Sequence, residues 1–228
     1  MADISGWKGG DGMIGIIDYG MGNLHSVSKA LERLGLPYFL ASEPEKLIKA
    51  EGLILPGVGS FRDAMTILKD NRQDGFIKTW SKDGRPLLGI CLGMQLLFEG
   101  SEENGNTEGL KLLSGYAKRF KGVSDEGVAY KVPHMGWNKL TFNQPNHQIL
   151  KGTEEGHVYF VHSYVVETEK KDVVIASSDY FGEVPAVVGQ GLTMGAQFHP
   201  EKSGQLGLQV LENFGKIVTG RRTIREQI

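Results

Sequence analysis

The sequence predicts an α/β fold in which helices flank a mixed, mainly parallel sheet. In the first hundred residues, short apolar runs alternate with stretches of helical periodicity, which is typical of β-α-β units. Beyond residue 100 the chain is rich in glycine and β-branched residues, which favours antiparallel strands added to the sheet. No repeat or low-complexity linker separates the two halves, so we expect one domain.

The expected parallel strands are short apolar runs. They cover residues 13–18, 38–41, 52–55 and 87–90. An apolar stripe from Leu24 to Leu34 predicts the first helix, which Gly35 closes. Ser42 and Glu45 have the spacing of a helix-capping pair, with Ser42 as the cap. The remaining expected elements are helices around 64–68, 76–80 and 205–218, and antiparallel strands at 128–132, 158–166 and 173–177.

Composition excludes several classes of protein. Lys+Arg 25 against Asp+Glu 27 gives a net charge of −2, without the basic face that nucleic-acid binding requires. No run of 18 apolar residues could span a membrane, and residues 1–12 lack a signal-peptide core. We expect a flexible leader at 1–12, a catalytic domain at 13–220, a solvated tail at 221–228 and a cytoplasmic location.

The single cysteine, Cys91, lies between an apolar strand and the helical stretch 94–98. Gly89 and Gly93 flank it, as in a nucleophile elbow, where the turn is too sharp for neighbouring side chains. Amide groups at the helix N-terminus favour the thiolate, and the backbone N–H of Leu92 can hold an oxyanion. We predict that Cys91 is a nucleophile; the alternative is a small buried hydrophobic residue.

A cysteine that attacks acyl carbon needs a histidine, which a carboxylate or amide normally orients. His199 follows an apolar strand, and Glu201 lies two residues further on, where it can turn back toward the ring. Pro200 fixes one backbone torsion between them. Of the 6 histidines, we therefore expect His199 to transfer protons and Glu201 to orient it.

Metal and dinucleotide sites are not favoured. One cysteine cannot build a cysteine-rich zinc site, and no H-x-x-x-H pair occurs on an expected helix. Gly20 and Gly22 follow a strand, but His25 stands where a dinucleotide-binding fingerprint has its third glycine. We predict no metal and no cofactor.

Cys91, His199 and Glu201 resemble the catalytic triad of the class I glutamine amidotransferases. The resemblance covers residues 13–220 and rests on six ordered motifs. These are DYGMGNLHSV at 18–27, PGVGSF at 56–61, GICLGMQLLF at 89–98, PHMGWN at 133–138, YFVHSY at 159–164 and GAQFHPEK at 195–202. The family implies a flavodoxin-like sheet and hydrolysis of L-glutamine to L-glutamate and ammonia through a cysteine thioester.

The same resemblance implies roles for residues that are uninformative on their own. It places the oxyanion hole at a backbone amide near Val58, with Gly59 beside it and Leu92 after the nucleophile. Because a peptide must turn there, glycines on either side of Val58 are expected. The substrate-binding residues that the resemblance implies are Gln95, Ser163, Tyr164 and Glu103, the last for the α-amino group.

The motifs further resemble those of glutaminase subunits that pass ammonia to a (βα)8-barrel cyclase subunit, as a heterodimer, in histidine biosynthesis. A barrel needs about 250 residues, so the acceptor chemistry is expected on another polypeptide. The residues implied to face this partner are Asn23, Met135, Trp137, Tyr159 and Lys202. Low activity of the chain alone is also expected, because the amide at Val58 needs the partner to turn.

Other functions remain open from sequence alone. A paralogous glutaminase that feeds a sugar-aminating partner in surface polysaccharide biosynthesis would carry the same triad. A binding module that keeps the fold without activity is disfavoured by the complete triad, and a cysteine peptidase or γ-glutamyl hydrolase is a weaker alternative.

Overall fold

The structure, a computed structural model, describes the backbone of residues 12–225 and the side chains of residues 12–220. The predicted leader therefore lies outside the described residues except for Gly12. The predicted tail lies outside them except for the backbone of residues 221–225, which continues the last helix. No helix in the described part of the chain is long and apolar enough to cross a membrane.

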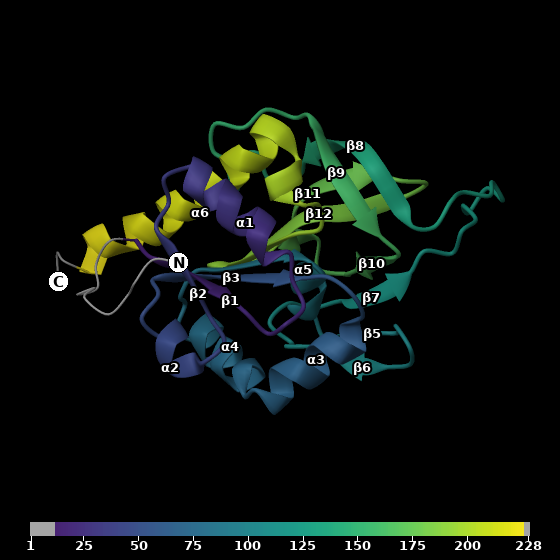
Figure 1. Cartoon of the computed structure of the whole chain (residues 1–228). Helices are drawn as coiled ribbons and strands as arrows, with labels where there is room; N and C mark the ends of the chain where they lie inside the picture. Colours follow the sequence, from purple (N-terminus) through teal and green to yellow (C-terminus); the bar gives the residue numbers. More distant parts are fainter. Residues whose placement is uncertain (1–11, 226–228) are drawn as a thin grey trace.

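A large sheet runs through the centre of the molecule (Figure 1). Within the described residues it has nine strands in the order β2-β1-β3-β4-β13-β12-β11-β8-β9. The first five pair in parallel: β2 (Tyr38–Ala41), β1 (Ile14–Ile17), β3 (Gly52–Gly57), β4 (Leu87–Cys91) and β13 (Thr193–Ala196). The others continue the sheet in antiparallel pairs: β12 (Glu183–Gln190), β11 (Val174–Asp179), β8 (His134–Phe142) and β9 (His157–His162).

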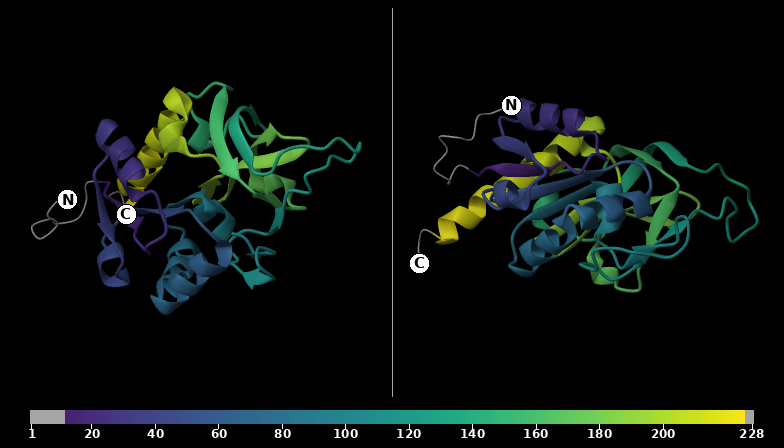
Figure 2. Two further views of the ribbon diagram at one scale, coloured as in Figure 1. Left: turned by 45° about the vertical axis from the view of Figure 1, so that its right-hand side comes forward. Right: turned by 60° about the horizontal axis from the view of Figure 1, so that its bottom comes forward.

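A second, smaller sheet lies at one side of the molecule, as the two views of Figure 2 show. Its order within the described residues is β10-β7-β5-β6. The strands are β10 (Tyr164–Glu167), β7 (Tyr116–Arg119), β5 (Gly100–Ser101) and β6 (Thr107–Glu108). Ser163 separates β9 from β10, so the chain leaves the large sheet for the small one at this residue.

Helices cover both faces of the large sheet (Figure 1). On one face lie α1 (Leu24–Arg33) and α6 (Gly204–Arg225); on the other lie α2 (Pro44–Leu47), α3 (Phe61–Asp70) and α4 (Gln73–Lys82). Each face has its own apolar core, with Leu31 and Phe214 in one and Leu68 and Trp80 in the other. The short elements are α5 (Leu92–Leu96), η1 (Gln148–Leu150), η2 (Lys171–Val173) and η3 (Pro200–Lys202).

The predicted α/β fold is confirmed, and the four expected parallel strands are all present. The expected cap of α2 is wrong. Glu43, not Ser42, precedes the helix, and its side chain makes no capping hydrogen bond. Pro44 occupies the first helical position, where its fixed φ starts the helix and its missing N–H costs nothing.

Three expectations for the second half also need correction. Residues 128–132 form no strand; a single bridge joins Val123 to Ala129, because this segment extends away from the sheet and has no neighbouring strand to pair with (Figure 1). The single strand expected at 158–166 is divided into β9 and β10. The last helix continues past residue 218 to Arg225.

Candidate active site

Cys91 lies at the sharp turn between β4 and α5. Its backbone adopts φ 54° and ψ −114°, a region that costs a residue with a side chain about 1–3 kcal/mol. A Cβ on Gly93 would overlap the carbonyl oxygen of Leu55, and one on Gly89 would lie 2.5 Å from the carbonyl oxygen of Gly93. Close packing of backbone against backbone therefore explains why glycine stands on both sides of the cysteine.

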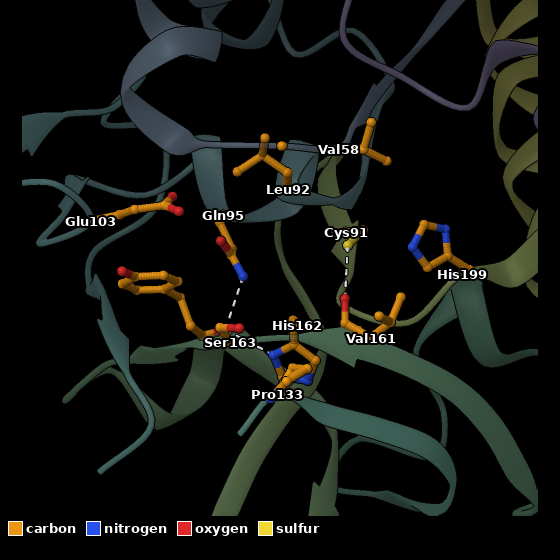
Figure 3. Close-up of a pocket in the computed structure, with 12 residues that line it drawn as sticks. Val58, Cys91, Leu92, Gln95, Glu103, Pro133, Val161, His162, Ser163 and His199 are labelled. Carbon is orange, nitrogen blue, oxygen red and sulfur yellow. Dashed lines mark hydrogen bonds between the residues drawn. The ribbon is translucent and has the colours of Figure 1, made fainter. Parts of the chain in front are cut away.

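The turn presents Cys91 to a pocket of about 410 Å³ at the carboxyl end of the parallel strands. Most of the sequence-predicted residues lie around it. The pocket is lined by Val58, Gly59, Cys91, Leu92, Gln95, Glu103, Pro133, Val161, His162, Ser163, Tyr164 and His199. In Figure 3, Cys91 and His199 occupy one end, whereas Gln95 and Glu103 lie toward the other.

Glu201 lies behind His199 rather than in the pocket wall. The Nδ1 atom of His199 lies 2.8 Å from Oε1 of Glu201, and the two side chains are 4% and 1% exposed. This contact comes from η3, in which Pro200 starts the turn that brings the carboxylate back to the ring. The imidazole is thus held by its Nδ1 atom and leaves Nε2 for the pocket.

Electrostatics at the pocket favour a protonated His199. Burial alone would lower the pKa of the imidazole, but its hydrogen bonds with Cys91 and Glu201 and their charges outweigh burial and raise the pKa to about 9. At neutral pH the ring therefore carries a proton that it can donate. The second carboxylate oxygen of Glu201, Oε2, is buried without a hydrogen-bond partner among the described residues.

Gln95 and Glu103 are fixed by contacts within the protein. The Nε2 atom of Gln95 donates to the carbonyl oxygen of Tyr164 at 3.0 Å and to Oε1 of Gln197 at 2.9 Å. Glu103 accepts the backbone N–H of Phe61 through Oε2 at 2.7 Å, so its second oxygen remains for other contacts.

Exposed apolar side chains lie on the pocket lining and on the strand beside it, and we call Val58, Met135 and Trp137 together the pocket mouth. Val58 is 42% exposed, and Gly59 beside it has φ +94°, which only glycine adopts without strain. Met135 and Trp137 on β8 are 60% and 54% exposed, and Met135 pairs with Val161 of β9, which lines the pocket. These two side chains are two residues apart on one strand, so they lie on the same face and form an exposed apolar pair.

The other predicted partner-facing residues lie close to this mouth. Tyr159 on β9 pairs with Trp137 on β8, with ring centroids 6.0 Å apart. Lys202 is exposed in η3, which packs against β9 and α1. Asn23 caps α1, where its Oδ1 accepts the N–H of Ser26 at 3.4 Å. The five predicted positions therefore belong to neighbouring elements.

Sequence reasoning assigned no role to several buried polar residues at this site. Gln197 is 1% exposed and donates its Nε2–H toward Cys91 Sγ at 3.9 Å. His134 and His162 form a buried pair, joined by a 3.0 Å contact between ring nitrogens. These residues lie within the motifs GAQFHPEK, PHMGWN and YFVHSY, but nothing in the sequence shows which polar side chains of a motif turn inward. No cluster of His, Cys, Asp and Glu among the described residues could hold a metal ion.

Comparison with solved structures supports the fold. The structure of a putative GMP synthase component from Thermoplasma acidophilum superposes with a TM-score of 0.69 at 22% identity, covering 94% of this chain and 97% of that one. PurLQS from Thermotoga maritima gives a TM-score of 0.67 at 18% identity, covering 89% and 96%. These similarities concern the fold alone.

Sequence comparison identifies the family. The model of the family "Glutamine amidotransferase class-I" matches residues 15–218. Relatives described as "Imidazole glycerol phosphate synthase subunit HisH" include proteins of Halalkalibacterium halodurans (64% identical over 90% of this chain and 96% of the relative) and Bacillus subtilis (54% over 92% and 99%). The chain therefore belongs to the class I glutamine amidotransferases and, within them, to the HisH subunits of imidazole glycerol phosphate synthase.

Proposed function

We propose that this protein is a glutaminase subunit that hydrolyses L-glutamine through a Cys91 thioester and delivers the ammonia to a (βα)8-barrel cyclase subunit in histidine biosynthesis. The observation that carries the proposal is one pocket with Cys91 on a nucleophile elbow beside a buried His199–Glu201 pair. Relatives 54–64% identical, all described as HisH, favour this acceptor over the sugar-aminating alternative. We infer a cytoplasmic location from the same relationship.

We infer one orientation for glutamine in the pocket. With the side-chain amide at Cys91, the α-carbon lies toward Gln95 and Glu103 (Figure 3). The free oxygen of Glu103 then faces the α-ammonium group, while Ser163 and Tyr164 line the same end. In this orientation, glutamine extends from Cys91 at one end of the pocket to Glu103 at the other.

In the first half of the reaction, the Cys91 sulfur passes its proton to His199 and attacks the amide carbon of glutamine. The carbonyl oxygen gains negative charge, which the backbone N–H of Leu92 and the peptide at Val58 and Gly59 stabilise. Protonated His199 then donates its proton to the leaving nitrogen, ammonia departs, and a glutamyl thioester remains on Cys91.

Water completes the cycle. His199, now neutral, accepts a proton from a water molecule whose oxygen attacks the thioester carbon. The carbon–sulfur bond breaks, glutamate leaves, and the imidazole regains the proton that Glu201 stabilises across their 2.8 Å contact. Glu201 acts through His199 and does not touch the substrate.

The partner-facing role of Met135 and Trp137 rests on their exposure at the pocket mouth. Ammonia that reached bulk water at neutral pH would be protonated and lose its nucleophilicity, so the mouth must be covered during turnover. An apolar rim of this kind suits a second protein surface. We include Asn23, Tyr159 and Lys202 in the same surface.

Coupled turnover tests the function. The chain is purified alone and co-expressed with a barrel cyclase subunit, and glutamate production is measured with and without the nucleotide ligand of the cyclase. We expect co-purification and low activity alone, which rises at least about tenfold in the liganded complex. Rapid glutamine hydrolysis by the chain alone would contradict the coupling, and association only with a sugar-aminating partner would support the alternative acceptor.

A further inference from the structure

A chain of four hydrogen-bond contacts runs from the end of β11 to the wall of the pocket. Asn138 Nδ2 donates to the carbonyl oxygen of Asp179 at 3.0 Å, and Asn138 Oδ1 lies 3.0 Å from His134 Nε2. His134 Nδ1 lies 3.0 Å from His162 Nε2. His162 Nδ1 lies 2.8 Å from the carbonyl oxygen of Tyr164, and His162 lines the pocket (Figure 3).

This chain is one proton short while both histidines are neutral. Its two ends are carbonyl oxygens, which only accept hydrogen bonds, so four contacts need four hydrogens. The amide of Asn138 supplies one and each neutral imidazole supplies one, which makes three. Turning the amide of Asn138 still leaves three hydrogens for four contacts. Its nitrogen would then donate to His134, but its oxygen would face the carbonyl oxygen of Asp179, and neither oxygen carries a hydrogen.

Burial keeps the rings of His134 and His162 neutral in the absence of substrate. Burial lowers the pKa of His162 to about 3, against its hydrogen bond to the Tyr164 carbonyl and together with the charges of His134 and His199. Burial also lowers the pKa of His134, although the hydrogen bond to Asn138 opposes this. Near neutral pH, one of the four contacts therefore lacks its hydrogen.

The groups around the pair suit a cation but do not supply an anion. The His134 ring stacks on Tyr180 at 4.0 Å and on Phe160 at 4.6 Å, and aromatic faces attract positive charge. Phe120 packs on both histidines, and His199 is the titratable neighbour of His162. Within the described residues, no carboxylate is hydrogen-bonded to either ring.

The end of the pocket that holds the α-carbon of glutamine lacks a positive charge for the α-carboxylate. Glu103 faces the α-ammonium group of the substrate, but no lysine or arginine is among the described residues that line the pocket. Arg119, Glu102 and Glu103 act on the hydroxyl of Tyr164 rather than on the two rings. Protonated His199 lies at the Cys91 end of the pocket, so the α-carboxylate of glutamine has no fixed positive charge beside it among the described lining residues, whereas His162 lines the same pocket.

We propose that the His134–His162 pair takes up one proton when L-glutamine binds, and that this shared proton is the positive charge that balances the substrate α-carboxylate. The proposal rests on the glutaminase function above. The proton comes from solvent and joins the unprotonated nitrogen in the chain, so all four contacts are complete and no bond to carbon changes. Free amino acids with an α-carboxylate are then preferred over peptide-linked glutamine, which has no charge at this position.

Proton uptake on binding is measurable by calorimetry. Glutamine is titrated into the Cys91→Ala protein at about pH 6.5, in two buffers that differ in ionisation enthalpy. We expect the binding enthalpy to differ between buffers by an amount that corresponds to uptake of about one proton per glutamine. By linkage, affinity must then rise as the pH falls.

Three further variants, each combined with Cys91→Ala, locate the proton. His134→Phe keeps an aromatic ring between Phe160 and Tyr180 but ends the chain, so the uptake disappears. Asn138→Asp places a carboxylate at the outer end, so the pair already carries its proton, and the uptake disappears for the opposite reason. His147→Asn removes a half-buried histidine that caps η1 and makes none of the four contacts, and it leaves the uptake unchanged.

The outcomes separate this proposal from the function on which it rests. Glutamine binding without any buffer dependence overturns the proposal, and so does an equal uptake in the His134→Phe or Asn138→Asp protein. If one of these variants does not fold, the other still decides. In the Asn138→Asp protein, the ring ¹⁵N signals must also show a protonated pair before glutamine is added. Absence of glutamine binding to Cys91→Ala would instead contradict the glutaminase function itself.

Discussion

The active site has a buried end, formed by Cys91 and His199, and an exposed mouth, and the two are built differently. Cys91 and His199 are 7% and 3% exposed, and backbone packing around Gly93 fixes the turn that carries the sulfur. Met135 and Trp137 at the pocket mouth are more than half exposed. The buried end is complete within one chain, whereas the mouth leaves apolar surface in water. The bond-breaking groups therefore depend on the fold of this chain, and the mouth is where a partner would act.

Removing the nucleophile gives the largest effect expected on the buried end. Cys91→Ala should reduce glutamine hydrolysis by about 10⁴-fold or more, because no other group can form the thioester. Glutamate production in steady state measures the loss. Glutamine affinity of the same protein is the control, since it should stay within about threefold of the parent. Hydrolysis within about tenfold of the parent would show that the buried end is not the reactive one.

Disturbing the turn tests whether backbone packing holds the nucleophile. Gly93→Ala should lower the free energy of unfolding by more than about 4 kcal/mol, because the new Cβ would overlap the carbonyl oxygen of Leu55. Urea denaturation measures the change. Gly75→Ala is the matched control: it lies within α4 with open space around it, so it should stabilise by about 0.5–1 kcal/mol. Equal effects of the two changes would refute the packing argument.

Local sequence signals determine the buried end, which is why its fold could be predicted. Each parallel strand is an apolar run next to a turn, and the glycines at 89 and 93 are needed by contacts that sequence spacing already implies. The Cys91 turn and the His199–Glu201 pair follow from short motifs, whereas Gln95, Glu103, Ser163 and Tyr164 were expected in the pocket only through the family resemblance. The role of each residue in catalysis stays a prediction.

The second half of the chain was harder to predict because its strands depend on partners distant in sequence. Residues 128–132 have strand-like composition, but no strand lies beside them, so only one bridge forms. The run 158–166 looks continuous, yet Ser163 transfers the chain between two sheets. Likewise, the contact of His134 with His162 joins β8 to β9 across 28 residues, and no local pattern reveals it.

The pH dependence of stability tests the electrostatics of the buried end. His199 has its pKa raised to about 9 in the folded protein, above the unfolded value of about 6.5, so its contribution is complete below about pH 6.5 and is lost as pH rises through about 9. The difference in free energy of unfolding between the parent and His199→Gln should shrink by about 3 kcal/mol across this window. Urea denaturation at several pH values measures it.

The sulfur provides the control for this measurement. Cys91 and Glu201 both raise the pKa of His199, so the pH-dependent difference should be smaller when His199→Gln is compared with the parent in a Cys91→Ala background. A difference that does not vary with pH in either background would mean that His199 is neutral in the folded protein.

Trp137 tests the pocket mouth, where the smallest effect is expected. Trp137→Ala should change the free energy of unfolding by less than about 0.5 kcal/mol, because the side chain is already 54% exposed. The same change should weaken binding to the barrel partner by about 2 kcal/mol, or about thirtyfold, since a tryptophan buried in an interface is a frequent source of affinity. Calorimetric titration of the two proteins measures the affinity.

Val128→Ala is the control, because Val128 is equally exposed, at 50%, but lies on the extended segment between β7 and β8. Equal losses of affinity in the two variants would mean that the partner does not cover the mouth selectively, and the contrast between the two ends of the site would then have no bearing on assembly.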